Sequence, residues 1–196
     1  DYTKKLIGAH SSLKLHNNIS NDVVLSAENA EVRFPVKKSF WGSVRQEIKA
    51  VDRVSFELRR GETLGIVGES GSGKTTLGMA VVNLIKSSGR FYLYNIEKQT
   101  IKRESKSFRK TIQIVFQDPY NSLNPRMNIE QIVAEGLEVH YSGLSKKDKK
   151  ERVIKVLSEV GLGAEILNKY PPEFSGGNRQ GIAISRALVL EPPVLV

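Results

Sequence analysis

One short segment restricts this chain more than any other feature: residues 68–75 read Gly-Glu-Ser-Gly-Ser-Gly-Lys-Thr. A glycine, four residues and then Gly-Lys-Thr is the pattern of a loop that wraps a polyphosphate. Glycines allow several backbone N–H groups to point inward, because they carry no Cβ that would clash. We therefore expect a nucleoside triphosphate to bind to consecutive residues of this loop: Gly68, Glu69, Ser70, Gly71, Ser72, Gly73, Lys74, Thr75 and Thr76.

The residues on either side of this loop have the patterns of a strand and a helix. Thr63 to Val67 predicts a short buried strand that enters the loop. Residues 75–85 predict a helix, whose N-terminus favours anions; its apolar residues recur at helical spacing, at Leu77, Ala80, Val81, Leu84 and Ile85. We expect Lys74 to contact the β- and γ-phosphates and the Thr75 hydroxyl to ligate Mg²⁺. An ordinary glycine-rich turn is the alternative, and the flanking patterns argue against it.

Composition excludes several classes of protein. Hydrophobic residues make up 39% of the chain, and no apolar run approaches the roughly 18–20 residues of a membrane span. No signal peptide is visible, and the absence of cysteine excludes disulfides and cysteine-ligated metals. The formal charge is +9, but the basic stretches at 98–110 and 146–150 contain a single aromatic residue, Phe108, and so lack the repeated aromatic residues of a single-strand binder. We expect a solvated basic face and no contact with nucleic acid.

The chain alternates between strand and helix patterns in an order that indicates an α/β core. Strands are expected at 23–34, 48–58, 90–94 and 111–116, and helices at 128–137, 146–160 and 178–190. Residues 194–196 return to an apolar strand pattern. A strand, loop and helix followed by a helical insert and another strand predict a core with a helical subdomain.

A second glycine motif, Ser175-Gly176-Gly177, stands directly before the last predicted helix. A serine hydroxyl and two unhindered N–H groups at a helix N-terminus can bind an anion, although alone such a motif is more often a turn and N-cap. Between the two glycine motifs the chain reads Phe-Gln-Asp-Pro-Tyr-Asn-Ser-Leu-Asn-Pro, at 116–125. In order and spacing, the three motifs resemble those of ATP-binding-cassette (ABC) ATPases, from about Val23 to the end. The wording at 116–125 resembles the oligopeptide/dipeptide importer subgroup.

This resemblance implies a fold and a set of residue roles. The fold would be an ABC-type P-loop NTPase core in residues 22–196, with an N-terminal antiparallel β subdomain and a helical subdomain at about 119–188. Gln117 would touch Mg²⁺ and the attacking water, and would link the core to the helical subdomain. Ser175, Gly176 and Gly177 would complete the ATP site of a partner domain. Phe34 would stack on adenine, with Trp41 as the second choice and strand packing as the alternative.

The chain departs from the family pattern within the signature motif. Phe174, Asn178 and Gly181 stand where the usual motif has leucine, glutamine and arginine. A glycine inside a helix costs about 1 kcal/mol relative to alanine. The missing arginine also removes a positive charge near the partner's ATP, so we expect altered engagement of the signature.

The two ends of the sequence favour a fragment of a longer protein. Residues 1–7 resemble the tail of an ATPase of the same subgroup, so 1–21 would be the tail of a preceding domain plus a linker, as in a tandem protein. Residues 194–196 resemble the lead-in to the Walker B strand, whose acidic residues would come later. We expect such a fragment to bind ATP without efficient hydrolysis, because attack by water needs an oriented nucleophile and a metal held on both sides.

The resemblance implies an ATPase that drives import of peptides or similar small solutes. Its partners would be a second ABC ATPase domain, membrane permease subunits and, indirectly, a solute-binding protein. It would lie on the cytoplasmic face of the membrane. Two alternatives remain: a non-transport ABC protein acting on ribosomes or nucleic acid, and a nucleotide-binding fragment without turnover.

Overall fold

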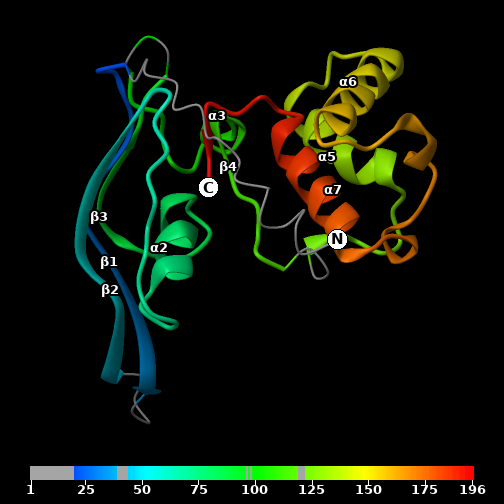
Figure 1. The fold of residues 1–196 in the computed structure, drawn as a ribbon. Coiled ribbons are helices and arrows are strands. Elements are labelled where there is room, and N and C mark those ends of the chain that lie inside the picture. The colour runs from blue at the N-terminus through cyan, green and yellow to red at the C-terminus, as the bar shows by residue number, and fades with distance from the viewer. Residues whose placement is uncertain (1–19, 39–43, 96, 98, 119–121) are drawn as a thin grey trace, which may run out of the picture.

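The computed structural model describes residues 20–38, 44–95, 97, 99–118 and 122–196. Within these ranges the chain forms a sheet body and a helical body, each built around its own hydrophobic cluster (Figure 1). The predicted linker before residue 20 and the candidate Trp41 lie outside the described residues.

The sheet body is built on an antiparallel sheet with the strand order β2-β1-β3. Its strands are β1 (Val23–Lys38), β2 (Val44–Arg59) and β3 (Ser88–Leu93). The first two form a long hairpin that extends beyond the rest of the body (Figure 1). The predicted strands at 23–34, 48–58 and 90–94 are confirmed, and the first two are longer than expected.

The pairing of β1 with β2 is interrupted beside the core. Val32 pairs with Val51 and Arg33 pairs with Lys49, so Ala50 has no partner across the hairpin. Such a bulge leaves one residue unpaired and bends its strand.

Helix α2 (Lys74–Val81) packs against the sheet through Leu77, Ala80 and Val81. It is shorter than the sequence predicted, because Leu84 and Ile85 lie beyond its end. Asn83 has a φ of 59°, in the left-handed region where asparagine is tolerated, and a helix cannot continue through it. Leu84 is accordingly exposed.

The sheet body also contains a small parallel pair of strands, β4 (Ile112–Gln113) and β5 (Val194–Leu195). Helix α3 (Lys106–Thr111) precedes β4, is capped by Ser105 and buries Phe108. The strand predicted at 111–116 is therefore confirmed only in part. Its first residue ends α3, although Val115 still donates to the Val196 carbonyl at 2.8 Å.

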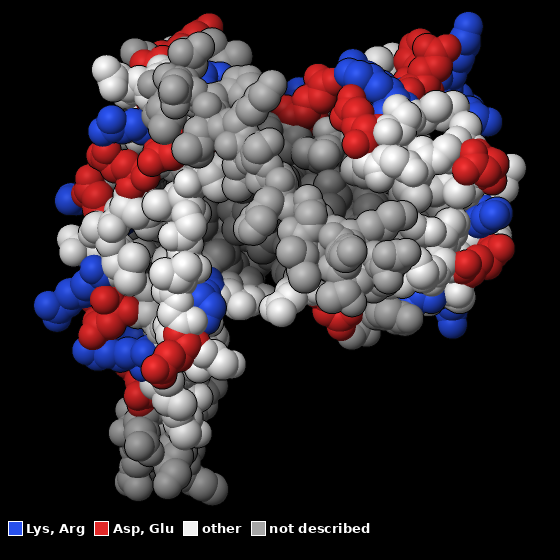
Figure 2. All heavy atoms as spheres, viewed as in Figure 1, with Lys and Arg blue, Asp and Glu red and all other residues white. Residues whose placement is uncertain are grey.

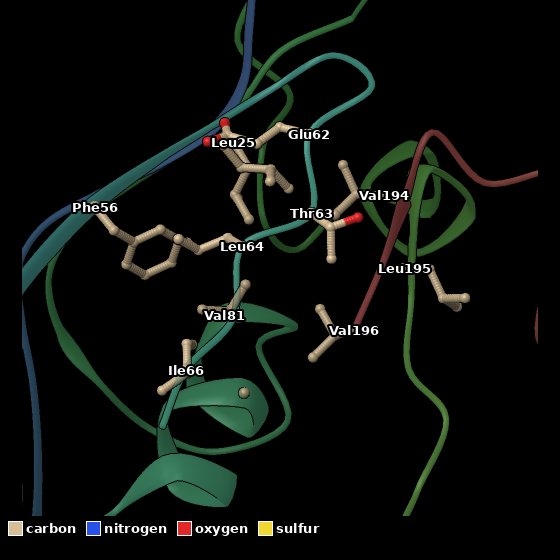
Figure 3. Close-up of a pocket in the computed structure, with 12 residues that line it drawn as sticks. Leu25, Phe56, Glu62, Thr63, Leu64, Ile66, Val81, Val194, Leu195 and Val196 are labelled. Carbon is tan, nitrogen blue, oxygen red and sulfur yellow. The ribbon is translucent and has the colours of Figure 1, made fainter. Parts of the chain in front are cut away.

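The strand predicted at Thr63–Val67 is wrong as regards both pairing and burial. Within the described residues, no backbone group of this segment bonds to another backbone group, and the whole segment is exposed. A strand requires a hydrogen-bonded neighbour, and β5 is separated from this segment by an apolar cavity of about 190 Å³ (Figure 3). Leu64 and Ile66 line that cavity together with Val81, Val194 and Val196.

The helical elements whose bounds lie within the described part of the helical body are three α-helices and two short 3₁₀ turns. The helices are α5 (Ile129–His140), α6 (Lys146–Glu159) and α7 (Gly176–Leu188), and the turns are η1 (Ala164–Ile166) and η2 (Pro171–Glu173). Their apolar faces meet in a core that includes Ile132, Val133, Leu137, Val153, Leu157 and Ile182. All three predicted helices are confirmed.

Capping residues explain where two of these helices begin. Asn128 and Gln131 form a reciprocal capping box at the start of α5. The Ser145 hydroxyl accepts from the Asp148 N–H at the start of α6. None of the helices in the described part of the chain has the length and apolar composition needed to cross a membrane.

Candidate functional site

The phosphate loop joins the exposed segment 63–67 to helix α2. Gly71 and Gly73 have φ values of 80° and 94°, which favour glycine over residues with a side chain. A Cβ on Gly73 would lie 2.1 Å from the carbonyl oxygen of Ala50, the bulge residue of β2. Hence the bulge in the hairpin and the glycine in the loop fit directly against each other.

The loop presents a set of donors suited to a polyphosphate. The first helical hydrogen bond of α2 runs from the Leu77 N–H to the Gly73 carbonyl, at 2.8 Å. Among the described residues, the N–H groups of Lys74, Thr75 and Thr76 have no acceptor, as expected for a first helical turn. These donors lie at the positive end of the helix dipole, so they fit the negative charge of a phosphate.

The Lys74 ammonium group lies over the loop. Its Nζ donates to the carbonyl oxygens of Gly68, at 2.9 Å, and Glu69, at 2.5 Å. The cation therefore lies over the loop that leads to the free N–H groups, and it can exchange its carbonyl contacts for phosphate oxygens.

The exposed Thr75 hydroxyl fits the role of a Mg²⁺ ligand at this loop. Within the described ranges, no group of three or more His, Cys, Asp or Glu side chains could hold a metal ion. Magnesium usually retains waters and binds through one or two protein oxygens plus phosphates, and such a site needs no acidic cluster.

Gln117 follows β4 on the chain segment that leads from the sheet body to the helical body (Figure 1). It lies in a bend, its side chain is exposed, and within the described ranges it makes no hydrogen bond. The structure therefore places Gln117 at the junction, and within the described residues no hydrogen bond joins it to Lys74 or Thr75.

Ser175, Gly176 and Gly177 form the exposed N-terminus of α7. The helix begins at Gly176, two residues earlier than its apolar pattern indicated. The Ser175 hydroxyl makes no capping hydrogen bond, and a Cβ on either glycine would meet nothing within 4 Å. In the described part of the chain, no hydrogen bond joins these residues to the phosphate loop. They belong to the helical body.

Phe34 lies on the hairpin, just beyond the bulge that abuts the loop. Its side chain is 44% exposed and it pairs across the hairpin with Ile48, which is 57% exposed. Val32, two residues earlier on the same face of β1, is buried in the sheet body. An exposed apolar pair next to the loop is inconsistent with simple core packing of Phe34.

Sequence reasoning missed Arg186, a half-buried residue of α7. Its Nη1 donates to the Ser122 carbonyl at 2.6 Å, across a sequence separation of 64 residues. The only sequence signal is its place in the same helix as Arg179, which is itself buried.

Among the described residues, the histidine whose pKa departs from its ordinary value is His140. Burial lowers its pKa below the ordinary value, and the cations of Lys106, Lys110 and Arg109 on α3 lower the pKa further. The cluster lies where α3 meets the end of α5. Lys110 also lies 4.1 Å from the centre of the Tyr141 ring.

Comparison with known proteins assigns this architecture. A family model described as ABC transporter matches residues 51–196. The chain belongs to the ABC transporter family.

Two relatives and one solved structure are similar to this ABC domain. It is 46% identical over 193 residues to the peptidoglycan transport ATP-binding protein YejF of Agrobacterium fabrum, covering 97% of this chain and 35% of that protein. It is 44% identical over 182 residues to the oligopeptide transport ATP-binding protein OppF of Haemophilus influenzae, covering 90% and 54%. The ATP-binding cassette MJ0796, a dimer bound to ADP and Pi, matches with a TM-score of 0.71 and 28% identity over 87% of this chain and 72% of that chain.

These findings confirm the predicted family, the ABC-type P-loop fold and the kinship with importer ATP-binding proteins. This ABC domain spans about a third to a half of the length of the two relatives.

The surface of this ABC domain carries interleaved charges. On the face shown in Figure 2, basic and acidic side chains alternate along the hairpin and over the outer helices. In the basic stretch 146–150, Lys147, Lys149 and Lys150 each lie within 4.0 Å of a glutamate carboxylate. The Lys149 pair with Glu138 is the shortest, at 2.6 Å. Lys149 itself is buried, so the solvated-face interpretation is supported for Lys147 and Lys150.

Proposed function

We propose that this chain is the nucleotide-binding part of an ABC importer ATPase, and that it binds MgATP through the loop 68–76. The observation that carries the proposal is that one loop and the helix start that follows it supply both the free N–H groups at 74–76 and the Lys74 ammonium group, which lies over the loop carbonyls. Phosphate recognition needs both oriented backbone donors and a cation. Thr75 would ligate Mg²⁺, and Phe34 would stack on the adenine ring.

The complete protein would couple ATP binding and hydrolysis to import of peptides or similar small solutes. The names of relatives that act in peptidoglycan and oligopeptide transport support this class of solute. Gln117 would sense Mg²⁺ and the attacking water, and its place between the two bodies supports a linking role. Membrane permease subunits would hold the protein at the cytoplasmic face, with a solute-binding protein as an indirect partner.

A second ABC domain would be needed to complete each ATP site. The exposed start of α7 supports this part of the proposal, because Ser175, Gly176 and Gly177 are exposed. Among the residues that the structure describes, no hydrogen bond joins them to their own phosphate loop. The dimeric cassette MJ0796 provides a precedent for pairing.

The test of MgATP binding is titration with a fluorescent ATP analogue. Lys74→Ala should weaken binding by roughly 10-fold or more, because a charge-assisted contact to the phosphates is lost. Lys86→Ala is the control for loss of a lysine charge: Lys86 is exposed, lies just beyond α2, and its replacement should leave the affinity unchanged. Equal affinities of Lys74→Ala and the unmodified chain would exclude the loop as the nucleotide site.

A further inference from the structure

Helix α7 carries two arginines that each hold a different segment of the chain. Arg179 donates from Nε to the Pro171 carbonyl at 2.8 Å and from Nη2 to the Pro172 carbonyl at 3.2 Å. Arg186 donates from Nη1 to the Ser122 carbonyl at 2.6 Å. The two arginines are seven residues apart, about two helical turns, so they project from the same side of the helix.

The two held segments lead to two of the predicted functional motifs. Pro171 and Pro172 run directly into Ser175, the first of the signature residues. Ser122 lies five residues after Gln117. A single helix is thus attached to the approach to the signature at one end, and to the segment that follows Gln117 at its other end.

The surroundings of Arg186 make its contact more than a surface hydrogen bond. Phe116, Asp118, Ser122 and Arg186 line one hollow at the junction of the two bodies. A hydrogen bond from a half-buried guanidinium is stronger than a neutral one, because the donor is charged and partly shielded from water. Near this end of α7, Leu190 packs against Gly136 of α5, where a Cβ would approach its side chain to 3.2 Å. Because α7 packs against α5 at this end, the hydrogen bond from Arg186 to Ser122 connects the junction to the packed helices of the helical body.

We propose that Arg186 is a positioning residue that couples the Gln117 segment to the signature through helix α7. This inference rests on the proposed function. When Gln117 engages the bound Mg²⁺ and phosphate, Ser122, five residues later in the sequence, is displaced. Arg186 transmits that displacement to α7, and the exposed Ser175 at the start of the helix changes its orientation toward a partner.

The absence of cysteine allows a direct test with paired spin labels. Lys86→Cys places a label on the sheet body and Lys147→Cys places one on α6, both at exposed positions. The distance between the labels is measured without nucleotide and with a non-hydrolysable MgATP analogue. In the otherwise unmodified chain the distance should change on binding.

Arg186→Ala should keep its nucleotide affinity within about twofold of the unmodified chain and lose the nucleotide-dependent change in distance. Arg186→Lys, which retains the cation, should recover part of that change and keeps the test available if the alanine variant does not fold. Arg126→Ala is the control, because Arg126 is an exposed arginine near the same segment; this variant should behave like the unmodified chain.

The outcomes separate the two proposals. Failure of the unmodified chain to bind the analogue would contradict the proposed function. If the analogue binds, an unchanged response of Arg186→Ala would overturn the coupling role, and so would the absence of any distance change in the unmodified chain. A lowered melting temperature with a normal distance response would mean that Arg186 is only structural, which also overturns the proposal.

Discussion

Two glycines of the phosphate loop are required for different physical reasons. Gly71 and Gly73 both have left-handed φ values, of 80° and 94°. Only Gly73 also faces a neighbour, because its Cβ would collide with the Ala50 carbonyl at 2.1 Å. Gly71 has open space around it. The hairpin thus dictates one glycine, and the loop's own conformation dictates the other.

The two alanine variants should therefore differ in severity. Gly71→Ala should lower the free energy of unfolding by about 1–2 kcal/mol, the cost of a left-handed residue with a side chain. Gly73→Ala adds a backbone clash, so it should be more destabilising and should abolish MgATP binding. Urea denaturation together with nucleotide titration measures both effects. Equal losses in the two variants would show that the contact with Ala50 does not matter.

The pH dependence of stability should carry a contribution from His140. Burial and the cations of Lys106, Lys110 and Arg109 hold its folded-state pKa below the ordinary value of 6.5. As pH falls through about 6.5, the unfolded chain takes up a proton first. The contribution of His140 to the free energy of unfolding is therefore fully present above pH 6.5. It is lost progressively as the pH falls from 6.5 to the lower pKa of His140 in the folded chain.

His140→Gln should remove this part of the slope while leaving the unfolding midpoint at pH 7.5 nearly unchanged. Urea midpoints measured between pH 7.5 and 5.5 provide the comparison. An identical slope in the variant and the unmodified chain would assign the pH dependence to other groups.

Among the elements, helix α5 depends most visibly on its cap. Asn128 accepts from the Gln131 N–H at 2.9 Å, and the Gln131 side chain accepts from the Asn128 N–H at 3.0 Å. Asn128→Ala should lower the free energy of unfolding of the helical body by about 1 kcal/mol. Asn128→Ser should restore most of the loss, because serine also caps. Thermal melts followed by circular dichroism test both, and equal melts for the two variants would contradict the capping role.

Elements determined by local residues could be predicted, and elements that need distant partners could not. Helices α5 and α6 were found from caps and apolar periodicity, both of which lie within the segment. Thr63–Val67 has the apolar pattern of a strand, but a strand exists only beside a neighbour, which the pattern does not provide. Helix α2 ended early because one left-handed residue, Asn83, outweighed the periodicity.

The same distinction between local and distant determinants applies to the residues of the candidate site. The motifs indicated the phosphate loop, Gln117 and the signature as candidates, because each is a contiguous run. Their spatial relation was not accessible from the sequence, and neither was Arg186, whose partner lies 64 residues away.

At the scale of the whole molecule, the sheet body and the helical body have separate hydrophobic clusters. Nucleotide binding should therefore stabilise the two bodies to different extents. The phosphate loop contacts β2 through Gly73 and Ala50, so MgATP should stabilise the sheet body most directly. At a concentration of 100 times Kd, a ligand stabilises the binding state by about 2.7 kcal/mol. Hydrogen exchange should therefore slow more in α2 and around Ala50 than in α6. Equal protection of α6 would show that the two bodies unfold as one unit.

The separation of the clusters also bears on the order of folding. Among the described residues, the buried members of the helical-body cluster all come from the run between Leu123 and Leu190, and Val115 packs against them. The cluster of the sheet body needs Val194 beside Ile112. The helical body can condense from contiguous chain, and short sequence separations favour fast folding. Once formed, it holds the ends of a long loop near each other and lowers the entropy lost when β4 meets β5. The helical insertion thus makes two strands that are distant in sequence into close neighbours before they pair.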